Sequence, residues 1–338
     1  MSVKTAVVIL NWNGKAFLEK FLPNVIRHSS TDAEIIVADN ASGDDSVSFI
    51  RSNFPSVRII INEKNEGFTG GYNIALKQVE ADYFVLLNSD VEVSKDWLKP
   101  LIALMEKDKS IAACQPKIIA YNDRSEFEYA GAGGGFIDKL GYPFCRGRIF
   151  NTLEKDKGQY NDTIDVFWAT GACMFVRASV YRELGGLDEN FFAHMEEIDL
   201  CWRMHRKGYR VCYCGQSEVY HVGGGTLAKN NPRKTYLNFR NNLLMIYKNS
   251  GNRKGSILRK RMFFDFVAAC KFLITNGFDD FKAVFRAHID FRKMKKLYPD
   301  ADEHKLNAFE NSTIYTRSIL LDYYFYNRKS FIDLNWTS

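Results

Sequence analysis

Four short apolar runs alternate with helix-like segments in the first 90 residues, and this alternation limits the fold more than any other feature of the chain. The runs are TAVVIL, AEIIVADN, VRIIIN and YFVLLN. The first intervening segment carries Phe17, Phe21 and Val25 at helical spacing. Such alternation, with continuous apolar strands, predicts a parallel, doubly wound α/β sheet that is buried on both faces. Ligands bind sheets of this kind at the carboxyl ends of the strands.

The composition is that of a protein with a packed core. Of the 338 residues, 46% are apolar and 25% are charged, and 46 basic side chains are offset by 40 acidic ones. This mild charge gives no argument for nucleic-acid binding, because no sharp basic patch or known module accompanies it. The chain enters its first strand without a signal peptide, and it has no apolar run of about 18 residues or more. We therefore expect a cytoplasmic protein, with peripheral attachment to the inner face of the cytoplasmic membrane as an option.

Each of the four apolar runs ends in asparagine or aspartate. The polar positions are Asn11 and Asn13, Asp39 and Asn40, Asn62 and Asn65, and Asn88 and Asp90. One such ending is ordinary turn chemistry, since these residues favour turns and caps. Four of them at one edge of a parallel sheet indicate a polar ligand lying across that edge.

Two of these strand ends have a more specific interpretation. The carboxylate of Asp39 can accept a hydrogen bond from the ring N–H of a uracil or thymine, although it can also cap its own turn. The loop NEKNEGFTGG after the third run has three glycines, which allow a ligand to approach the backbone closely. A helix beginning near Gly70 would then direct its amide groups at anionic oxygens, and the alternative is a plain connecting loop.

Asn88 and Asp90 flank Ser89 at the end of the fourth run. Alternate residues of an extended chain face the same way, so both side chains can address one cation. Mg²⁺ or Mn²⁺ prefers oxygen ligands and also binds phosphate oxygens. Because Asn88 offers a neutral oxygen, we expect a weak site that fills when a nucleotide is present. Glu92 has the same parity as Asp90 and is a substitute ligand.

The segment from 167 to 226 holds the remaining candidates. A helix there begins with Glu196, Glu197 and Asp199. These acids either complement the positive end of the helix dipole or include a general base that removes a proton from a sugar hydroxyl. His221 precedes three glycines, and it is either a structural histidine or a residue that approaches phosphate. The earlier glycine run AGAGGGF, residues 130–136, is expected to form a flexible turn.

Taken in order, these segments resemble the family 2 inverting glycosyltransferases with the GT-A fold, and most closely the branch of rhamnosyltransferases of polysaccharide assembly. The matching segments are VVILNWNG, IIVADNASGDDS, NEGFTGGYNIAL, YFVLLNSDVEV, WATGACMFVRASVYRELGGLDENFFAHMEEIDLCWR and VYHVGGGT. The resemblance covers residues 3 to 230. It implies a mainly parallel, Rossmann-like sheet flanked by helices, with a C-terminal helical appendage.

The resemblance also implies a role for each matching residue. Asn11 and Asn13 line the nucleotide pocket, Asp39 reads the pyrimidine, and Asn65, Gly67 and Asn73 border the nucleotide and its ribose or diphosphate. Asn88 and Asp90 stand where the family has its Asp-x-Asp motif, and His221 completes the metal or diphosphate site. The segment with Trp168, Thr170 and Gly171 faces the donor sugar and acceptor. Glu197 is the general base, with Glu196 as the alternative. Two positions depart from the family pattern, since Asn88 replaces the first Asp of the metal motif and Glu197 replaces an Asp.

The predicted function is inverting transfer of a sugar from a nucleoside diphosphate sugar, held with Mg²⁺ or Mn²⁺, to a hydroxyl of a growing cell-surface glycan on a polyprenyl diphosphate carrier. Rhamnose from dTDP-rhamnose is the first expectation, and a hexose from a UDP-sugar is the second. The alternatives are a non-catalytic sugar-nucleotide-binding subunit and a nucleotidylyltransferase. We expect a catalytic domain over residues 1–230 and a helical region over 231–338, whose mixed basic and aromatic residues suit either an anionic membrane surface or packing on the catalytic domain.

Overall fold

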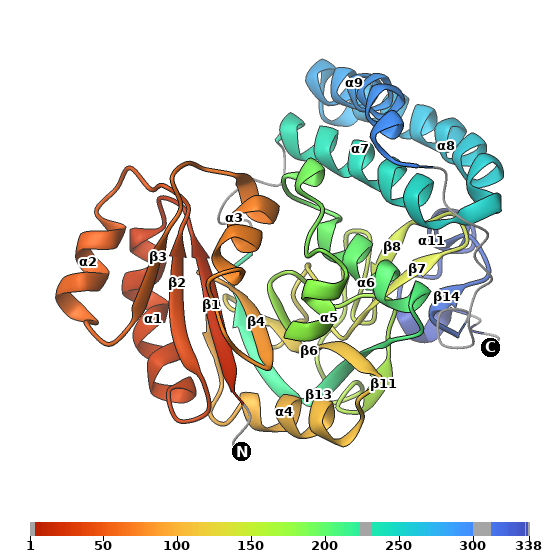
Figure 1. Cartoon of the computed structure of the whole chain (residues 1–338). Helices are drawn as coiled ribbons and strands as arrows, with labels where there is room; N and C mark the ends of the chain where they lie inside the picture. The colour runs from red at the N-terminus through yellow and green to blue at the C-terminus, as the bar shows by residue number, and fades with distance from the viewer. Residues whose placement is uncertain (1–3, 224–230, 300–311, 335, 337–338) are drawn as a thin grey trace.

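A mixed sheet forms the centre of the protein, with helices on both faces (Figure 1). The computed structural model describes residues 4–223, 231–299, 312–334 and 336. Within these residues the central sheet has nine strands in the order β11-β13-β6-β12-β4-β1-β2-β3, with β5 paired to β13. In chain order the strands are β1 (Thr5–Asn11), β2 (Glu34–Asp39), β3 (Arg58–Ile61), β4 (Tyr83–Asn88), β5 (Val91–Val93), β6 (Ile111–Ala120), β11 (Thr163–Asp165), β12 (Cys173–Arg177) and β13 (Arg210–His221).

The four apolar runs are the four strands at one side of this sheet. β1 pairs in parallel with β2 and β4, and β2 pairs in parallel with β3. Along β1, Val7 and Ile9 enter one core and Ala6 and Val8 enter the other, since alternate side chains of a strand face opposite ways. The helices are α1 (Lys15–Ser29), α2 (Ser46–Asn53) and α4 (Leu98–Lys107) on one face, and α3 (Gly67–Leu76), α5 (Ala178–Glu183) and α6 (Glu196–Arg206) on the other. The predicted α/β fold is confirmed.

The other half of the sheet is mixed. β12 inserts antiparallel between β4 and β6, whereas the long β13 runs parallel to β6. This arrangement brings the end of β13, at His221, beside β5, which follows directly on the end of β4. The strand ends of both halves therefore contribute to one edge of the sheet.

A second sheet contains a strand from near the C-terminus. Its order is β10-β9-β8-β7-β14, and β14 pairs in parallel with β7. The strands are β7 (Gly135–Asp138), β8 (Pro143–Cys145), β9 (Arg148–Ile149), β10 (Thr152–Leu153) and β14 (Ile314–Tyr315). Five aromatic side chains close over this sheet with ring centroids 4.9 to 6.3 Å apart in each contact, namely Phe136, Phe144, Tyr315, Phe331 and Trp336. The region after residue 230 is thus mainly helical but also completes a sheet begun in the middle of the chain.

Three long helices form a layer beside this second sheet (Figure 1). They are α7 (Pro232–Asn249), α8 (Lys254–Thr275) and α9 (Phe278–Met294), and α7 contacts α6 as well as the other two. The short elements are η1 (Glu189–Phe191), η2 (Gly251–Arg253), η3 (Lys295–Leu297), α11 (Ile319–Tyr324) and η4 (Phe331–Asp333). None of the helices in the described residues has the length and apolar character needed to cross a bilayer.

Candidate active site

The ends of β1 and β2 are joined by a hydrogen-bond network. The Nδ2 of Asn11 donates to Oδ1 of Asp39 at 2.9 Å, and the backbone N–H of Ser42 donates to Oδ2 of the same carboxylate at 2.9 Å. Asn13 accepts from the backbone N–H of Gly43 at 2.7 Å. Asp39 is buried, and its bond from Ser42 caps the turn after β2. This is the turn-capping role that the sequence offered as the alternative to ligand binding. Contact between Asp39 and a pyrimidine stays a prediction.

The loop before α3 is organised by asparagine side chains. Asn40 donates to Oδ1 of Asn65 at 3.0 Å and to the carbonyl oxygen of Gly67 at 2.9 Å, and it accepts from Nδ2 of Asn62 at 3.1 Å. Asn65 in turn accepts from the backbone N–H of Gly67 at 2.9 Å. These bonds fix the loop against the end of β2 before any ligand binds.

The amino end of α3 is not open to an anion. The helix begins at Gly67, and the amide groups of Phe68 and Thr69 donate to the carbonyl oxygen of Phe192 at 2.8 and 3.2 Å. The expectation that this helix directs free amide groups at a phosphate is therefore wrong. Gly67 has φ +71°, and a Cβ placed on it would lie 2.5 Å from the ring of Phe192, so glycine permits this contact between two loops.

Asn73 on α3 forms its hydrogen bonds with residues 181–189 and not with the polar residues at the strand ends. Its amide donates to the carbonyl oxygen of Leu187 at 2.8 Å and to Oε1 of Glu189 at 3.2 Å. Its Oδ1 accepts from the hydroxyl of Tyr181 at 2.7 Å and from the backbone N–H of Leu187 at 3.0 Å. All of its hydrogen-bonding capacity is used inside the protein, so the prediction that Asn73 borders the nucleotide is not carried further.

A buried histidine lies between two carboxylates at the end of β13. His221 Nε2 is 3.1 Å from Oδ1 of Asp90, and its Nδ1 is 3.2 Å from Oε2 of Glu128, the second being a charge contact without hydrogen-bond geometry. Asn88 Nδ2 lies 3.5 Å from the same Nε2. Burial alone would lower the pKa of His221, but contact with the two carboxylates outweighs it and raises this pKa to about 10. His221 is therefore a cation at neutral pH.

This group suits a divalent cation only in part. In the described residues, no three His, Cys, Asp or Glu side chains are arranged to hold a metal ion by themselves. Both ring nitrogens of His221 lie within 3.2 Å of carboxylate oxygens, and its role as a metal ligand stays a prediction. Asp90 still offers its second oxygen, which has no protein partner among the described residues. The donor set fits a cation that takes most of its ligands from a bound diphosphate.

Trp168 and Thr170 are packed against the glycine run at 130–136. The indole N–H of Trp168 donates to the carbonyl oxygen of Phe136 at 3.0 Å, and a Cβ on Gly135 would lie 2.2 Å from the Trp168 ring. The hydroxyl of Thr170 is hydrogen-bonded to backbone groups at 3.0 and 3.1 Å. The expectation of a flexible turn at 130–136 is wrong, because residues 131–136 are buried. Trp168 and Thr170 are buried, and only Gly171 of the predicted trio is partly exposed.

The first turn of α6 contains three acids, of which one has a structural role and two each have a carboxylate oxygen without a partner. Asp199 is fully buried and pairs with Nε of Arg203 and Nζ of Lys248, each at 2.9 Å. Glu196 and Glu197 each keep one buried carboxylate oxygen without a partner. Burial raises the pKa of Glu197 to about 7, and burial together with the neighbouring Glu197 raises the pKa of Glu196 well above its usual value. A carboxyl group with a pKa near 7 suits a general base at neutral pH.

The loop that delivers these acids has a strained backbone. Phe192, His194 and Met195 have φ values of 65°, 71° and 71°, a region that side chains other than glycine rarely adopt. Asn241 of α7 stabilises this loop, since its Nδ2 lies 2.8 to 3.0 Å from three backbone carbonyl oxygens of residues 191–194. The C-terminal helices therefore position the start of α6.

Gly171 shows how closely α6 approaches the segment before β12. A Cβ on Gly171 would lie 3.4 Å from the Phe68 ring and 3.9 Å from the Cβ of Glu197. The next residue, Ala172, accepts a hydrogen bond from the backbone N–H of Asn88 at 3.0 Å. Glu197 and the Asn88–Asp90 strand end are thus joined by two consecutive residues.

The other link runs through the loop after β1. A Cβ on Gly14 would lie 2.5 Å from Oδ1 of Asn11 and 3.6 Å from Oγ of Ser89. Because Asn11 also bonds to Asp39, the ends of β1, β2 and β4 form one continuous surface. Asp39 and the Asn88–Asp90 strand end thus meet at the carboxyl edge of the sheet, and a single site that also includes Glu197 stays a prediction.

Three residues of this site were missed from the sequence, and a fourth, Asn40, was named only as a polar strand end without a role of its own. Trp12 is an aromatic side chain with 49% exposure at a polar strand end, and its place between two asparagines was an available signal. Asn40 is the centre of the loop network, Glu128 contacts His221, and Asn241 binds the strained loop. The last two lie far from their partners along the chain, so no local pattern announced them.

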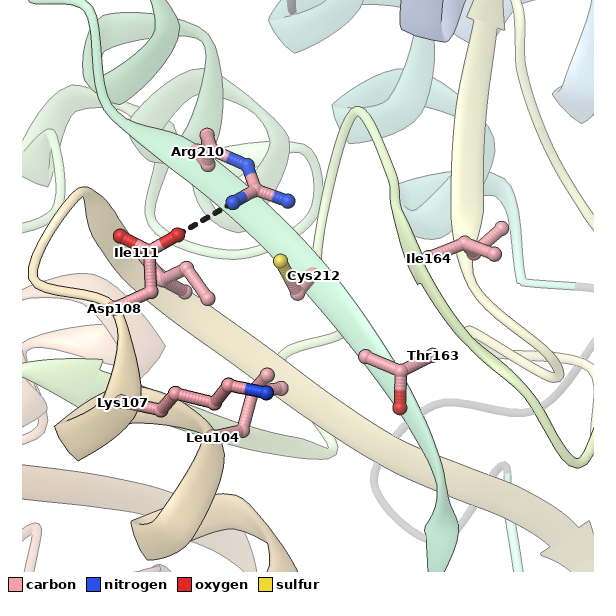
Figure 2. Close-up of a pocket in the computed structure, with 8 residues that line it drawn as sticks. All are labelled: Leu104, Lys107, Asp108, Ile111, Thr163, Ile164, Arg210 and Cys212. Atoms are coloured by element: carbon pink, nitrogen blue, oxygen red, sulfur yellow. Dashed lines mark hydrogen bonds and ion pairs between the residues drawn. The ribbon is translucent and has the colours of Figure 1, made fainter.

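The pocket drawn in Figure 2 lies elsewhere. The cavity has a volume of about 310 Å³ and is lined in part by residues of α4 and β13. Arg210 pairs with Asp108 there at 2.6 Å, and Figure 2 shows this pair among the lining side chains. Arg210 begins β13 and His221 ends it, which places the two roughly 35 Å apart at about 3.3 Å per residue. This cavity therefore has no part in the strand-end site.

Comparison with known sequences shows which family the chain matches. The model of glycosyl transferase family 2 matches residues 6–185, more than half of the 338 residues. The N-acetylglucosaminyl-diphospho-decaprenol L-rhamnosyltransferase of Mycobacterium tuberculosis is 25% identical over 231 residues, which are 64% of this chain and 75% of that protein. The rhamnosyltransferase WbbL of Escherichia coli is 28% identical over 162 residues, 46% of this chain and 60% of that one.

Solved structures share the fold at low sequence identity. A structure of GalNAc-T7 with UDP, GalNAc and Mn²⁺ superposes with a TM-score of 0.59 at 16% identity, over 88% of this chain and 58% of that chain. Staphylococcus aureus TarS 1–349 in complex with UDP-GlcNAc gives a TM-score of 0.56 at 16% identity, over 85% and 80%. These likenesses confirm the GT-A fold. Together with the family match over residues 6–185, they lead to one conclusion: the chain belongs to glycosyl transferase family 2 and is a glycosyltransferase.

Proposed function

We propose that this enzyme transfers a sugar, with inversion, from a nucleoside diphosphate sugar to a hydroxyl of a cell-surface glycan carried on polyprenyl diphosphate. The observation that carries the proposal is the carboxylate of Glu197, which has one buried oxygen without a partner. The Cβ of Glu197 lies near Gly171, and the next residue, Ala172, accepts a hydrogen bond from Asn88 at the strand end. An unpartnered buried carboxylate costs stability, so its retention beside a ligand-binding edge supports a chemical role.

The nucleotide binds along the ends of β1, β2 and β3 in this proposal. Asn13 and Asp39 meet the pyrimidine, and the exposed ring of Trp12 offers a flat apolar surface for stacking on it. Asn65 and Gly67 shape the wall next to the ribose, because their mutual hydrogen bond fixes the loop there. The presence of UDP or UDP-GlcNAc in two solved structures that share this fold supports a pyrimidine nucleotide at this edge.

The diphosphate lies over Asp90, Asn88 and His221. The cationic ring of His221 is held by Asp90 and Glu128 and supplies positive charge close to the leaving group. Mg²⁺ or Mn²⁺, when bound through Asp90, would neutralise further charge on the diphosphate oxygens. The structure of GalNAc-T7 named above contains Mn²⁺ with UDP, which supports divalent metal dependence in this fold.

The reaction is a single displacement at the anomeric carbon. Glu197 accepts the proton of the acceptor hydroxyl as that oxygen bonds to the anomeric carbon, and the bond from this carbon to the diphosphate oxygen breaks with its electron pair leaving on the diphosphate. Attack opposite the leaving group inverts the anomeric configuration. Because Glu197 must be deprotonated and its pKa is raised to about 7, activity rises with pH through this region.

The choice of substrates rests on the relatives. Two of them are named as rhamnosyltransferases, and one of these acts on an N-acetylglucosaminyl-diphospho-decaprenol. We therefore place dTDP-rhamnose first as donor, with UDP-hexoses second, and a saccharide on polyprenyl diphosphate as acceptor. Such an acceptor requires the enzyme to work as a peripheral protein at the inner face of the cytoplasmic membrane.

A donor screen tests the proposal. Purified full-length enzyme is mixed with dTDP-rhamnose, UDP-galactose, UDP-glucose or GDP-mannose, with Mn²⁺, Mg²⁺ or EDTA, and with a short polyprenyl diphosphate-linked N-acetylglucosamine. We expect one pyrimidine nucleotide sugar to give a product whose anomeric configuration, read by NMR, is opposite to that of the donor. Retention of configuration, or transfer only from GDP-mannose, would contradict the proposal.

A further inference from the structure

Helix α8 buries its polar side. The residues of α8 that are buried include Arg261 and Asp265, whose charged groups lie 3.3 Å apart. The guanidinium of Arg261 lies 3.5 Å from the ring centroid of Tyr142, and Nε2 of His288 on α9 lies 3.2 Å from Asp265. This ionic group anchors α8 to the rest of the protein, which is the reverse of the usual surface helix whose apolar side faces the core.

The opposite side of α8 presents large apolar side chains to solvent. Phe263 is 64% exposed and Ile274 is 87% exposed, and the spacing of Phe263, Phe266, Val267 and Ile274 places them on one stripe of the helix. Phe266 contacts Phe285 of α9 with ring centroids 6.3 Å apart, so the stripe continues onto the next helix. We call this surface the α8–α9 apolar face, and it consists of Phe263, Phe266, Val267, Ile274, Phe278, Phe285 and Ile289.

The same two helices, together with η3 directly after them, carry the positive charge of the chain. Residues 254–297 contain eleven lysine and arginine residues and four aspartates, an excess of seven, whereas the whole chain has a net charge of +6. The rest of the chain is therefore close to neutral. Lys282 lies 4.3 Å from the ring centroid of Phe278, so basic groups are interleaved with the apolar face itself.

We propose that the α8–α9 apolar face binds an anionic membrane surface, with its aromatic and aliphatic side chains among the lipid headgroups and acyl chains and its basic residues against the lipid phosphates. Aromatic and aliphatic side chains flanked by lysine and arginine are the composition of interfacial helices. A second copy of the chain is a poor partner for this face, because a symmetric contact would bring two clusters of excess positive charge together. The inference deepens the proposed function, since it places the enzyme where a lipid-linked acceptor lies.

Vesicle flotation with full-length protein and no sugar substrate tests this inference independently of catalysis. Wild type is expected to float with vesicles of phosphatidylglycerol and phosphatidylcholine, and much less with phosphatidylcholine alone. The double substitution Phe263→Ser and Ile274→Ser should weaken binding to the anionic vesicles about tenfold or more, because exposed groups that would enter the membrane are lost. Ile332→Ser is the matched control, since Ile332 is 85% exposed but lies outside the face, and it should bind like wild type.

Charge reversal provides a second arm. Arg259→Glu with Lys271→Glu should also lower binding to anionic vesicles, and Arg51→Glu with Lys77→Glu, at exposed positions on α2 and directly after α3, should not. Equal flotation of the Phe263/Ile274 variant and the Ile332 control, or a concentration-dependent dimer in light scattering that only the Phe263/Ile274 variant loses, would overturn the inference. Either result leaves the transferase proposal standing, because sugar transfer to a short soluble acceptor is measured separately.

Discussion

The two halves of the active site differ in how their polar groups are satisfied. At the ends of β1 to β3, Asn11, Asp39, Asn40 and Asn65 bond mainly to one another and to the backbone, and the groups left buried without partners are the neutral amide oxygens of Asn11 and Asn62. At the start of α6, oxygens of Glu196 and Glu197 and a nitrogen of His194 are buried without partners, on a loop with a strained backbone. The first half is a preformed cradle whose shape is fixed by the protein. In the second half the groups without partners are titratable, which is expected of the part that performs chemistry.

The largest expected effect comes from the unpartnered half. Glu197→Gln keeps the shape of the side chain but cannot accept the proton, so the transfer rate should fall by roughly 100- to 10,000-fold. Binding of the nucleotide, measured by calorimetry, should stay within about twofold, because the strand ends are untouched. Glu196→Gln is the control and should retain most activity. A Glu196→Gln variant that is inactive beside a fully active Glu197→Gln variant would exchange their roles.

Among these substitutions, replacing the buried cation His221 should have the largest effect on stability. His221→Gln removes the positive charge between Asp90 and Glu128, leaving two carboxylates that were buried around it. Removing one partner of a buried charge group costs about 3 to 5 kcal/mol, so the melting temperature should fall by many degrees. The double variant Glu128→Gln with His221→Gln should recover part of this loss. Wild-type stability of His221→Gln would show that the group is solvated rather than buried.

The acids of α6 should make stability depend on pH. The folded-state pKa of Glu197 is raised to about 7 and that of Glu196 is also raised, so the stability they contribute is present below pH 4.5 and is lost as pH rises toward 7. Replacing both by glutamine should remove this loss. The free energy of unfolding of the variant, relative to wild type, should therefore rise by about 1 to 3 kcal/mol when the pH is raised from 5 to 8. Denaturant unfolding at the two pH values measures the difference. A gain that is equal at both pH values would contradict the assignment of raised pKa values.

Sequence reasoning found the fold, and it proposed one edge of the sheet for the site, because these signals were local. The four parallel strands and the polar residues that end them follow from short-range periodicity. It failed for Asn73 and Trp168, because a sequence does not tell which neighbour a polar or aromatic side chain faces. It missed the pairing of Glu128 with His221 and of Asn241 with the strained loop, since both join distant parts of the chain. It also missed the strands of the second sheet, which have two to four residues each and no clear alternation.

The smallest expected effect tests the cradle half. Trp12→Ala removes a half-exposed ring from the proposed base site, so donor affinity should fall roughly five- to tenfold, at the low end of the stacking energies measured for bases on aromatic side chains. The rate at saturating donor should change little, since Trp12 does not touch the reacting atoms in this proposal. Trp12→Phe should recover most of the affinity. A large fall in the saturated rate with unchanged donor affinity would place Trp12 in the chemical half of the site.

Strand β14 has a consequence for how the protein is made. Tyr315 pairs with Asp138 in the second sheet, and Trp336 packs on Phe136, so this sheet waits for residues synthesised long after its first strands. At about 5 to 20 residues per second, the ribosome needs roughly 10 to 40 seconds to cover the distance from β7 to the final aromatic side chains. Once residue 221 has been synthesised, the nascent chain holds every proposed catalytic residue, while an apolar sheet surface stays uncovered until Trp336 is made. Chaperone capture during translation should therefore concentrate on chains that have passed Phe144 but not yet reached Trp336.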